Sequence, residues 1–175
     1  MELAIALLIL VALGFLYYGW LRLRQEAEAK ARQLIFRKSH REGEGAVARS
    51  HRVTPRSASA TELLDAAWAA IDVPEGTESL NWLGATIFKV RSDDQSTIFF
   101  TLKWKYGSPN WIAMLSLEDD GSLSWSVPQA RQLNGLVPEA KSLANLERRV
   151  IRALRLRDPY CVITSEESKT QWKRQ

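Results

Sequence analysis

The sequence predicts an α+β protein in which a single N-terminal transmembrane helix precedes a small domain, an antiparallel four-stranded meander flanked by two helices (α-β-β-β-β-α). Of the 19 residues from Leu3 to Leu21, 17 are apolar and none is charged or Pro. Four segments between residues 85 and 127 alternate apolar and polar residues, and a segment with helical spacing lies on each side of them. We therefore expect a transmembrane helix at 1–24, a helical extension and basic flexible linker at 25–58, and a soluble domain with a polar C-terminal tail at 59–175.

The apolar run has the length of a membrane span. At ~1.5 Å per residue it covers ~28 Å, close to the ~30 Å thickness of the hydrocarbon core of a bilayer. A cleaved signal peptide is the alternative, but it needs a basic stretch before the apolar run and a site of small residues after it, and neither is present. The expected membrane interface consists of the aromatic rings and first cations at the end of the run, Tyr17, Tyr18, Trp20, Arg22 and Arg24.

The charge distribution predicts the orientation of this anchor. Between residues 22 and 56 there are ten Lys and Arg against four Glu. By the positive-inside rule, the N-terminus lies outside and the domain lies in the cytoplasm, which indicates a single-pass protein of an inner (plasma) membrane. The single cysteine, Cys161, agrees with a reducing compartment. The basic segment is expected to contact anionic lipid headgroups as well as to set the topology.

The segment after the anchor changes character near residue 37. Residues 22–36 are rich in good helix formers, so the span is expected to continue as a helix. Residues 37–59 contain Gly, Ser and Pro with few apolar side chains, which is typical of a flexible linker. His40 and His51 match no metal-ligand spacing and are expected to be solvated.

The domain itself begins with a capping box at Ser59–Glu62, which starts a helix that ends by Pro74. Strands are predicted at 85–91, 97–106, 110–117 and 122–127, followed by a helix from Pro138 to about Leu156, a short strand at 160–164 and a frayed tail at 165–175. On the second strand the alternation places one set of side chains on one face (Ile98, Phe100, Leu102, Trp104 and Tyr106) and a second set on the other (Phe99, Thr101, Lys103 and Lys105).

Reaction signatures are missing from the sequence. It contains no G-x-S-x-G, P-loop, G-x-G-x-x-G or H-E-x-x-H motif, so no catalytic residue, cofactor or metal is predicted. Cys161 has no His in the predicted domain to activate it. The acidic residues at 93–94 and 118–120 have the character of hairpin turns, since Gly121 follows the second group and hard cations need six or more oxygen ligands.

Two surfaces are candidates for binding a partner: the arginines of the last helix (Arg148, Arg149, Arg152 and Arg155), and a sheet face with Lys103 and Lys105 beside Phe99, joined by Ile87, Lys89 and Arg91 if the registers match. The commoner explanation of the arginines on the last helix is that they lie on a helix face exposed to solvent. Aromatic rings between cations are typical of single-stranded nucleic-acid platforms. However, from residue 57 onward there are 14 basic and 15 acidic residues, so the domain lacks the positive field that such binding uses.

The leading hypothesis is a membrane-anchored, non-enzymatic accessory or adaptor protein. Its cytoplasmic domain binds another membrane or membrane-associated protein, while the anchor contacts the lipid bilayer. The alternatives are a membrane-tethered nucleic-acid-binding protein and an enzyme with an unrecognised carboxylate site.

Overall fold

The computed structural model describes residues 14, 17–24, 27, 37–76, 84–104, 107–133, 136–167 and 171–174. The chain divides into two compact units, Met1–Lys38 and Ser39–Gln175. In the first unit residues 17–24 are helical. Among the described residues, no helix has both the length and the apolar character needed to cross a membrane. The predicted span from Leu3 to Leu21 lies mostly outside the described residues.

The second unit is an α+β domain, as predicted. Its helices, of which the first begins at the end of the preceding unit, are α2 (Arg37–Ala48), α3 (Ala60–Ala70) and α4 (Ala140–Arg157). Its strands are β1 (Arg49–Thr54), β2 (Thr86–Arg91), β3 (Thr97–Lys103), β4 (Trp111–Leu117), β5 (Leu123–Gln132), β6 (Val162–Glu167) and β7 (Gln171–Arg174).

One sheet contains all of these strands. The order is β2-β3-β4-β5-β1-β6, with antiparallel pairing throughout, and β7 pairs in parallel with β5. Strands β2 to β5 form the predicted four-stranded meander, and β6 overlaps the short strand predicted at 160–164. The expected number of strands is nevertheless too small, because β1 and β7 join the same sheet. The first strand in the chain, β1, lies between β5 and β6, with His51 opposite both Trp125 and Ser165. In the part of the chain that the structure describes, β6 is an edge strand.

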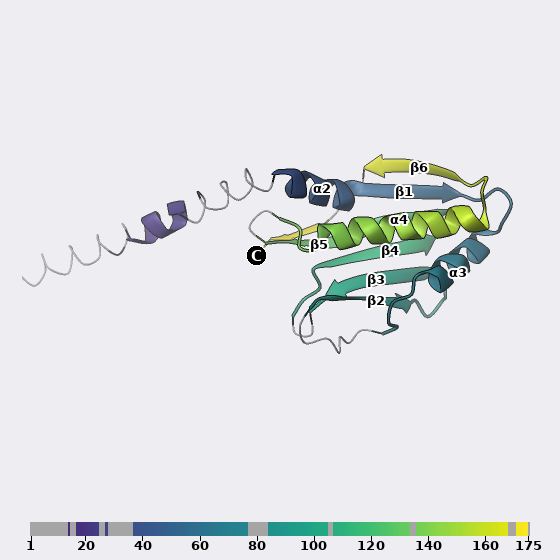
Figure 1. Ribbon diagram of the computed structural model, residues 1–175, viewed down its shortest axis with the longest axis horizontal. Helices are drawn as coiled ribbons and strands as arrows, with labels where there is room; N and C mark the ends of the chain where they lie inside the picture. The colour runs from purple at the N-terminus through teal and green to yellow at the C-terminus, as the bar shows by residue number, and fades with distance from the viewer. Residues whose placement is uncertain are drawn as a thin grey trace, which may run out of the picture. The chain divides into compact units, whose positions relative to one another are not determined.

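Helices α3 and α4 pack against each other and cover one face of the sheet (Figure 1). The alternation predicted for β3 is confirmed at Ile98, Phe100 and Leu102, which face the helices and are buried. The largest fully buried side chains are Trp111, Trp125, Phe100, Leu63, Leu64, Ile71, Ile98, Leu115, Leu123, Leu143, Leu146 and Leu154. Because α4 buries its apolar stripe in this core, its arginine-rich side faces away from the core.

Two local contacts fix α3. The capping box is confirmed: the Ser59 hydroxyl accepts from the Glu62 backbone N–H, and the Glu62 carboxylate accepts from the Ser59 N–H. At the other end of the helix, the Lys89 Nζ donates to the carbonyls of Trp68 (2.9 Å) and Ile71 (3.0 Å). Lys89 therefore joins β2 to the C-terminus of α3, where unpaired carbonyls attract a cation.

The flexible linker predicted at 25–58 is wrong for residues 37–54, which form α2 and β1. Two glycines lower the helix propensity of this segment, but they also permit a close approach. A Cβ at Gly43 would lie 3.2 Å from the Cβ of Ala140 and 3.3 Å from that of Val137. In β1 only His51 and Val53 are buried, while Arg49 and Arg52 are exposed. A strand this short and polar is specified by its two neighbours rather than by its own sequence.

The ends of two other segments also differ from expectation. The tail predicted to fray at 165–175 contains the end of β6 and all of β7. The strand predicted at 97–106 ends at Lys103, because the pairing of β3 with β4 ends where Leu102 lies opposite Trp111. Trp104, expected to share a face with Ile98, Phe100 and Leu102, is 47% exposed. Tyr106 and Lys105 lie outside the described residues.

Candidate functional site

A groove lies along α4, on the side of the helix toward β1 and β6 (Figure 1). We call it the α4–β6 groove. It has a volume of about 500 Å³ and is lined by His51 from β1, by Glu147, Arg148, Ile151, Arg152, Arg155 and Leu156 from α4, and by Ile163 and Ser165 from β6. The order of the strands brings these elements together, since β1 inserts beside β6 and α4 precedes β6 in the chain.

A second hollow extends this groove along α4. It has a volume of about 310 Å³ and is lined by Arg49, Ala140, Lys141, Ala144, Asn145 and Arg148. The two hollows share Arg148, so they adjoin each other along the helix. All the charged side chains that line the second hollow are basic.

The cations of the groove are not neutralised by neighbouring carboxylates. Arg148, Arg152 and Arg155, the α4 arginines, are exposed, and none forms an ion pair with a described side chain. Arg148 donates instead to the Ala144 carbonyl and the Asn145 side chain within the helix. Other arginines of the domain are paired with carboxylates: Arg49 with Glu147 (4.0 Å), Arg52 with Asp120, Arg91 with Asp65, and Arg157 with Glu62. The α4 arginines therefore form a concentration of positive charge that is not ion-paired within the described part of the chain.

Two buried side chains, His51 and Glu147, and the exposed Ser165 form a hydrogen-bonded polar chain along the floor of the groove. The Nε2 atom of His51 lies 2.5 Å from the Glu147 carboxylate, and its Nδ1 atom lies 3.1 Å from the Ser165 hydroxyl. The Glu147 carboxylate accepts a hydrogen bond from the Nε2–H of His51, and the Nδ1 atom of the same ring is hydrogen-bonded to the Ser165 hydroxyl. His51 is 9% and Glu147 6% exposed. The expectation of a solvated His51 is therefore wrong, and the one carboxylate among the described lining residues is already bonded.

The second predicted surface keeps Phe99 and Lys103 on one face of β3 but is not joined by the three residues expected from β2. In the β2–β3 register, Ile87, Lys89 and Arg91 lie opposite Leu102, Phe100 and Ile98, on the face that the helices cover. Lys103 lies on the other face with Phe99, away from the α4 arginines. Alternate residues of a strand point to opposite faces of the sheet. The observed register differs from the required one by one residue, so Ile87, Lys89 and Arg91 lie on the opposite face from Phe99 and Lys103.

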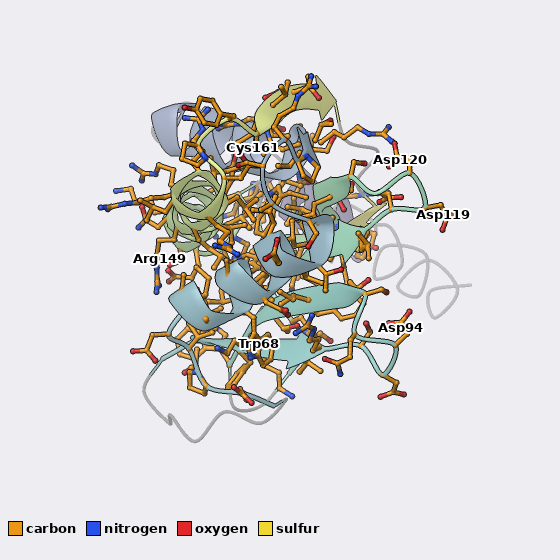
Figure 2. The ribbon with its side chains drawn as sticks, turned by 90° about the vertical axis from the view of Figure 1, so that its right-hand side faces the viewer. Trp68, Asp94, Asp119, Asp120, Arg149 and Cys161 are labelled. Atoms are coloured by element: carbon orange, nitrogen blue, oxygen red, sulfur yellow. The ribbon has the colours of Figure 1, made fainter. Side chains whose placement is uncertain are left out.

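The remaining arginine of the predicted set, Arg149, is exposed on α4 but does not line the groove. Figure 2 shows it on the outer side of the helix, and Asp94, Asp119 and Asp120 on turns at the opposite side of the domain. At the β4–β5 turn the Gly121 N–H donates to the Glu118 carbonyl, as the turn prediction requires.

These acidic turns do not have the features of a reactive site. The Ser92 hydroxyl and the Ser96 backbone hold the pKa of Asp94 at about 2, so this carboxyl is ionised at neutral pH. A general acid needs the opposite shift. Among the described residues, no group of three or more His, Cys, Asp and Glu side chains is placed to hold a metal ion. Cys161 is half-buried, and burial raises the pKa of its thiol, which opposes nucleophilic reactivity.

In the first unit, the predicted membrane-interface residues lie on one helical segment. The rings of Tyr17 and Trp20 stack with centroids 6.4 Å apart, and the Arg24 guanidinium lies 5.5 Å from the centroid of the Trp20 ring. Tyr18 and Arg22 are also exposed. Rings and cations are thus presented together, an arrangement that favours the headgroup region of a bilayer.

Comparison with protein-family models, with curated proteins and with solved structures gives no match for this chain. Sequence reasoning found the α4 arginines but missed His51, Glu147 and Ser165. The available signal was the alternation of His51 and Val53, which is typical of a strand.

Proposed function

We propose that this protein is a single-pass, membrane-anchored accessory protein whose α+β domain binds a protein partner in the α4–β6 groove. The uncharged run from Leu3 to Leu21 anchors it, with the N-terminus outside and the domain in the cytoplasm. The basic charge that follows the run and the exposed rings of Tyr17, Tyr18 and Trp20 support this topology.

The observation that carries the binding proposal is the concentration of unneutralised arginines in an open groove. Arg guanidinium groups form paired hydrogen bonds with carboxylates and are frequent at interfaces. Exposed apolar side chains accompany them: Leu156 is 74% exposed and Tyr160 77%. A membrane anchor strengthens such binding, because it holds the domain at high local concentration beside other membrane proteins.

Site-specific photo-crosslinking in cells tests this function. A photoreactive residue at Leu156, in the groove, should capture one protein in the membrane fraction, and Arg152→Glu in the same chain should abolish the product. The matched control places the photoreactive residue at Gln95, an exposed position in the β2–β3 turn. Equal products from both positions, or adducts with lipid alone, would contradict a partner-binding groove.

Protease protection tests the topology separately. In intact spheroplasts the domain should resist protease added outside, and it should be digested once the membrane is permeabilised. Digestion without permeabilisation would place the domain on the outer side and refute the proposed orientation.

A second candidate function comes from the hydrogen bonds that join the side chains of Ser165, His51 and Glu147. A hydroxyl, an imidazole and a carboxylate in this order also activate serine nucleophiles for acyl transfer. An active-site-directed fluorophosphonate should then label the protein at Ser165, and Ser165→Ala should abolish the label. If the reagent does not label the protein, the three hydrogen-bonded side chains serve only as a polar contact that joins β1, α4 and β6.

A further inference from the structure

We infer that the α4–β6 groove binds an extended acidic segment of the partner, which adds to the sheet along β6 and places its carboxylates on the α4 arginines. This inference rests on the proposed function and specifies the chemistry and conformation of the partner. Charge complementarity, spacing and the position of β6 each support it.

The charge of the groove favours an acidic occupant. Arg148, Arg152 and Arg155 are exposed without a described carboxylate partner. Lys141 and Arg49 continue the basic lining into the adjoining hollow, although Arg49 also lies 4.0 Å from the Glu147 carboxylate. The one described carboxylate in the lining, Glu147, is buried against His51. A basic segment would therefore meet uncompensated repulsion here, whereas carboxylates would find several guanidinium groups.

The spacing of the arginines fits an extended chain. Arg148 and Arg152 are four residues apart on the helix, which gives a separation along the axis of ~6 Å, and Arg152 and Arg155 are separated by ~4.5 Å. Side chains on one face of a strand repeat every ~6.6 Å. Acidic residues at alternate positions of an extended peptide would thus follow the arginines along α4.

The open edge of β6 supplies the backbone partner. β6 pairs with β1 through its inner edge, and no described strand pairs with its outer edge. An exposed edge offers a row of N–H and C=O groups to an incoming strand. Ile151, Leu156 and Ile163 line the same groove, so the residues between the acidic ones have apolar surface to contact.

The length of the groove limits the length of the bound segment. The lining runs from Lys141 to Leu156, which corresponds to ~22 Å along the helix. An extended chain covers that distance with about seven residues.

The test measures binding of a fluorescent peptide of about seven residues, in which Glu alternates with Val and Thr, to the full-length protein in neutral detergent micelles. Fluorescence anisotropy should show saturable binding that weakens as salt is added. Arg152→Glu should weaken binding by about tenfold or more, since it replaces an attractive contact by a repulsive one. The matched control, Arg149→Glu, makes the same charge change on the same helix outside the groove and should weaken it by less than about twofold.

A second probe tests the strand addition. A peptide with the same side chains but methylated at alternate backbone nitrogens keeps its charge and loses donors that a strand uses, so it should not bind. Equal binding of the methylated peptide, or equal weakening by Arg149→Glu and Arg152→Glu, overturns the inference. So does failure of the peptide to bind while nanodiscs of anionic lipid or a single-stranded oligonucleotide bind in an Arg152-dependent way. If crosslinking at Leu156 still captures a membrane protein, the inference fails and the proposed function stands.

Discussion

The hydrogen bond between His51 and Glu147 gives the most direct prediction about stability. Replacing Glu147 by Leu leaves the Nε2–H of His51 without an acceptor in a site where His51 is 9% exposed. A buried donor without a partner costs about 1–3 kcal/mol, so we expect Glu147→Leu to reduce the free energy of unfolding by about 2 kcal/mol. With a urea m-value of about 2 kcal/mol/M, this corresponds to a fall of about 1 M in the unfolding midpoint.

The assay is urea unfolding of residues 37–175 followed by tryptophan fluorescence, because Trp111 and Trp125 are buried in the core. His51→Leu alone should cost about 1–3 kcal/mol, since it removes the hydrogen bond to the Glu147 carboxylate and leaves it only the Arg49 guanidinium, 4.0 Å away. The double variant should cost less than the sum of the two single variants. Arg149→Leu, an exposed change on the same helix, is the control. A cost below about 0.5 kcal/mol for Glu147→Leu, or strict additivity, would refute this account of the groove floor.

Three further outcomes are expected. Deleting residues 37–54 should unfold the domain, because Ala46, Val47 and Val53 belong to its core, whereas deleting residues 1–36 should leave circular dichroism and cooperative unfolding intact. Lys89→Met should reduce the free energy of unfolding by about 1–3 kcal/mol, because it removes the donor that reaches the Trp68 and Ile71 carbonyls; a change below about 0.5 kcal/mol in urea unfolding would contradict that role. The Ser57 hydroxyl and the backbone N–H groups of Arg56 and Ser57 hold the pKa of Asp158 below its ordinary value. The stability that this carboxylate contributes is therefore present above about pH 4 and lost as the pH falls toward its folded pKa, so Asp158→Asn should unfold more readily at pH 7 and show a flatter dependence of stability on pH between about 5 and 2.

Patterns that repeat within a segment were predictable from the sequence. The meander β2 to β5 follows from alternating apolar residues between turns, and the capping box at Ser59–Glu62 marks the start of α3. The apolar stripe of α4 determines which side of that helix is buried, and hence that its arginines are exposed. These features depend on neighbours a few residues away, so local composition is sufficient to indicate them.

The same local reasoning was insufficient for α2 and β1. The sequence of α2 contains two glycines and many polar residues, and β1 has two buried side chains. Neither segment contains enough apolar surface to indicate an ordered element by itself. Both are ordered because other parts of the domain supply the contacts: Gly43 admits the start of α4, and Val53 joins the core between β5 and β6.

The sequence by itself determined the apolar N-terminal run, the basic charge after it, the α+β class and the exposed arginines of the last helix. Only the tertiary structure decided that these arginines border a groove whose floor is His51, Glu147 and Ser165. His51 lies 114 residues from Ser165 and 96 from Glu147 in the chain. The physical reason is that a groove between a helix and a sheet edge depends on the order of the strands in the sheet. That order arises from pairing between distant segments, and the sequence of one segment does not indicate which other segment it pairs with.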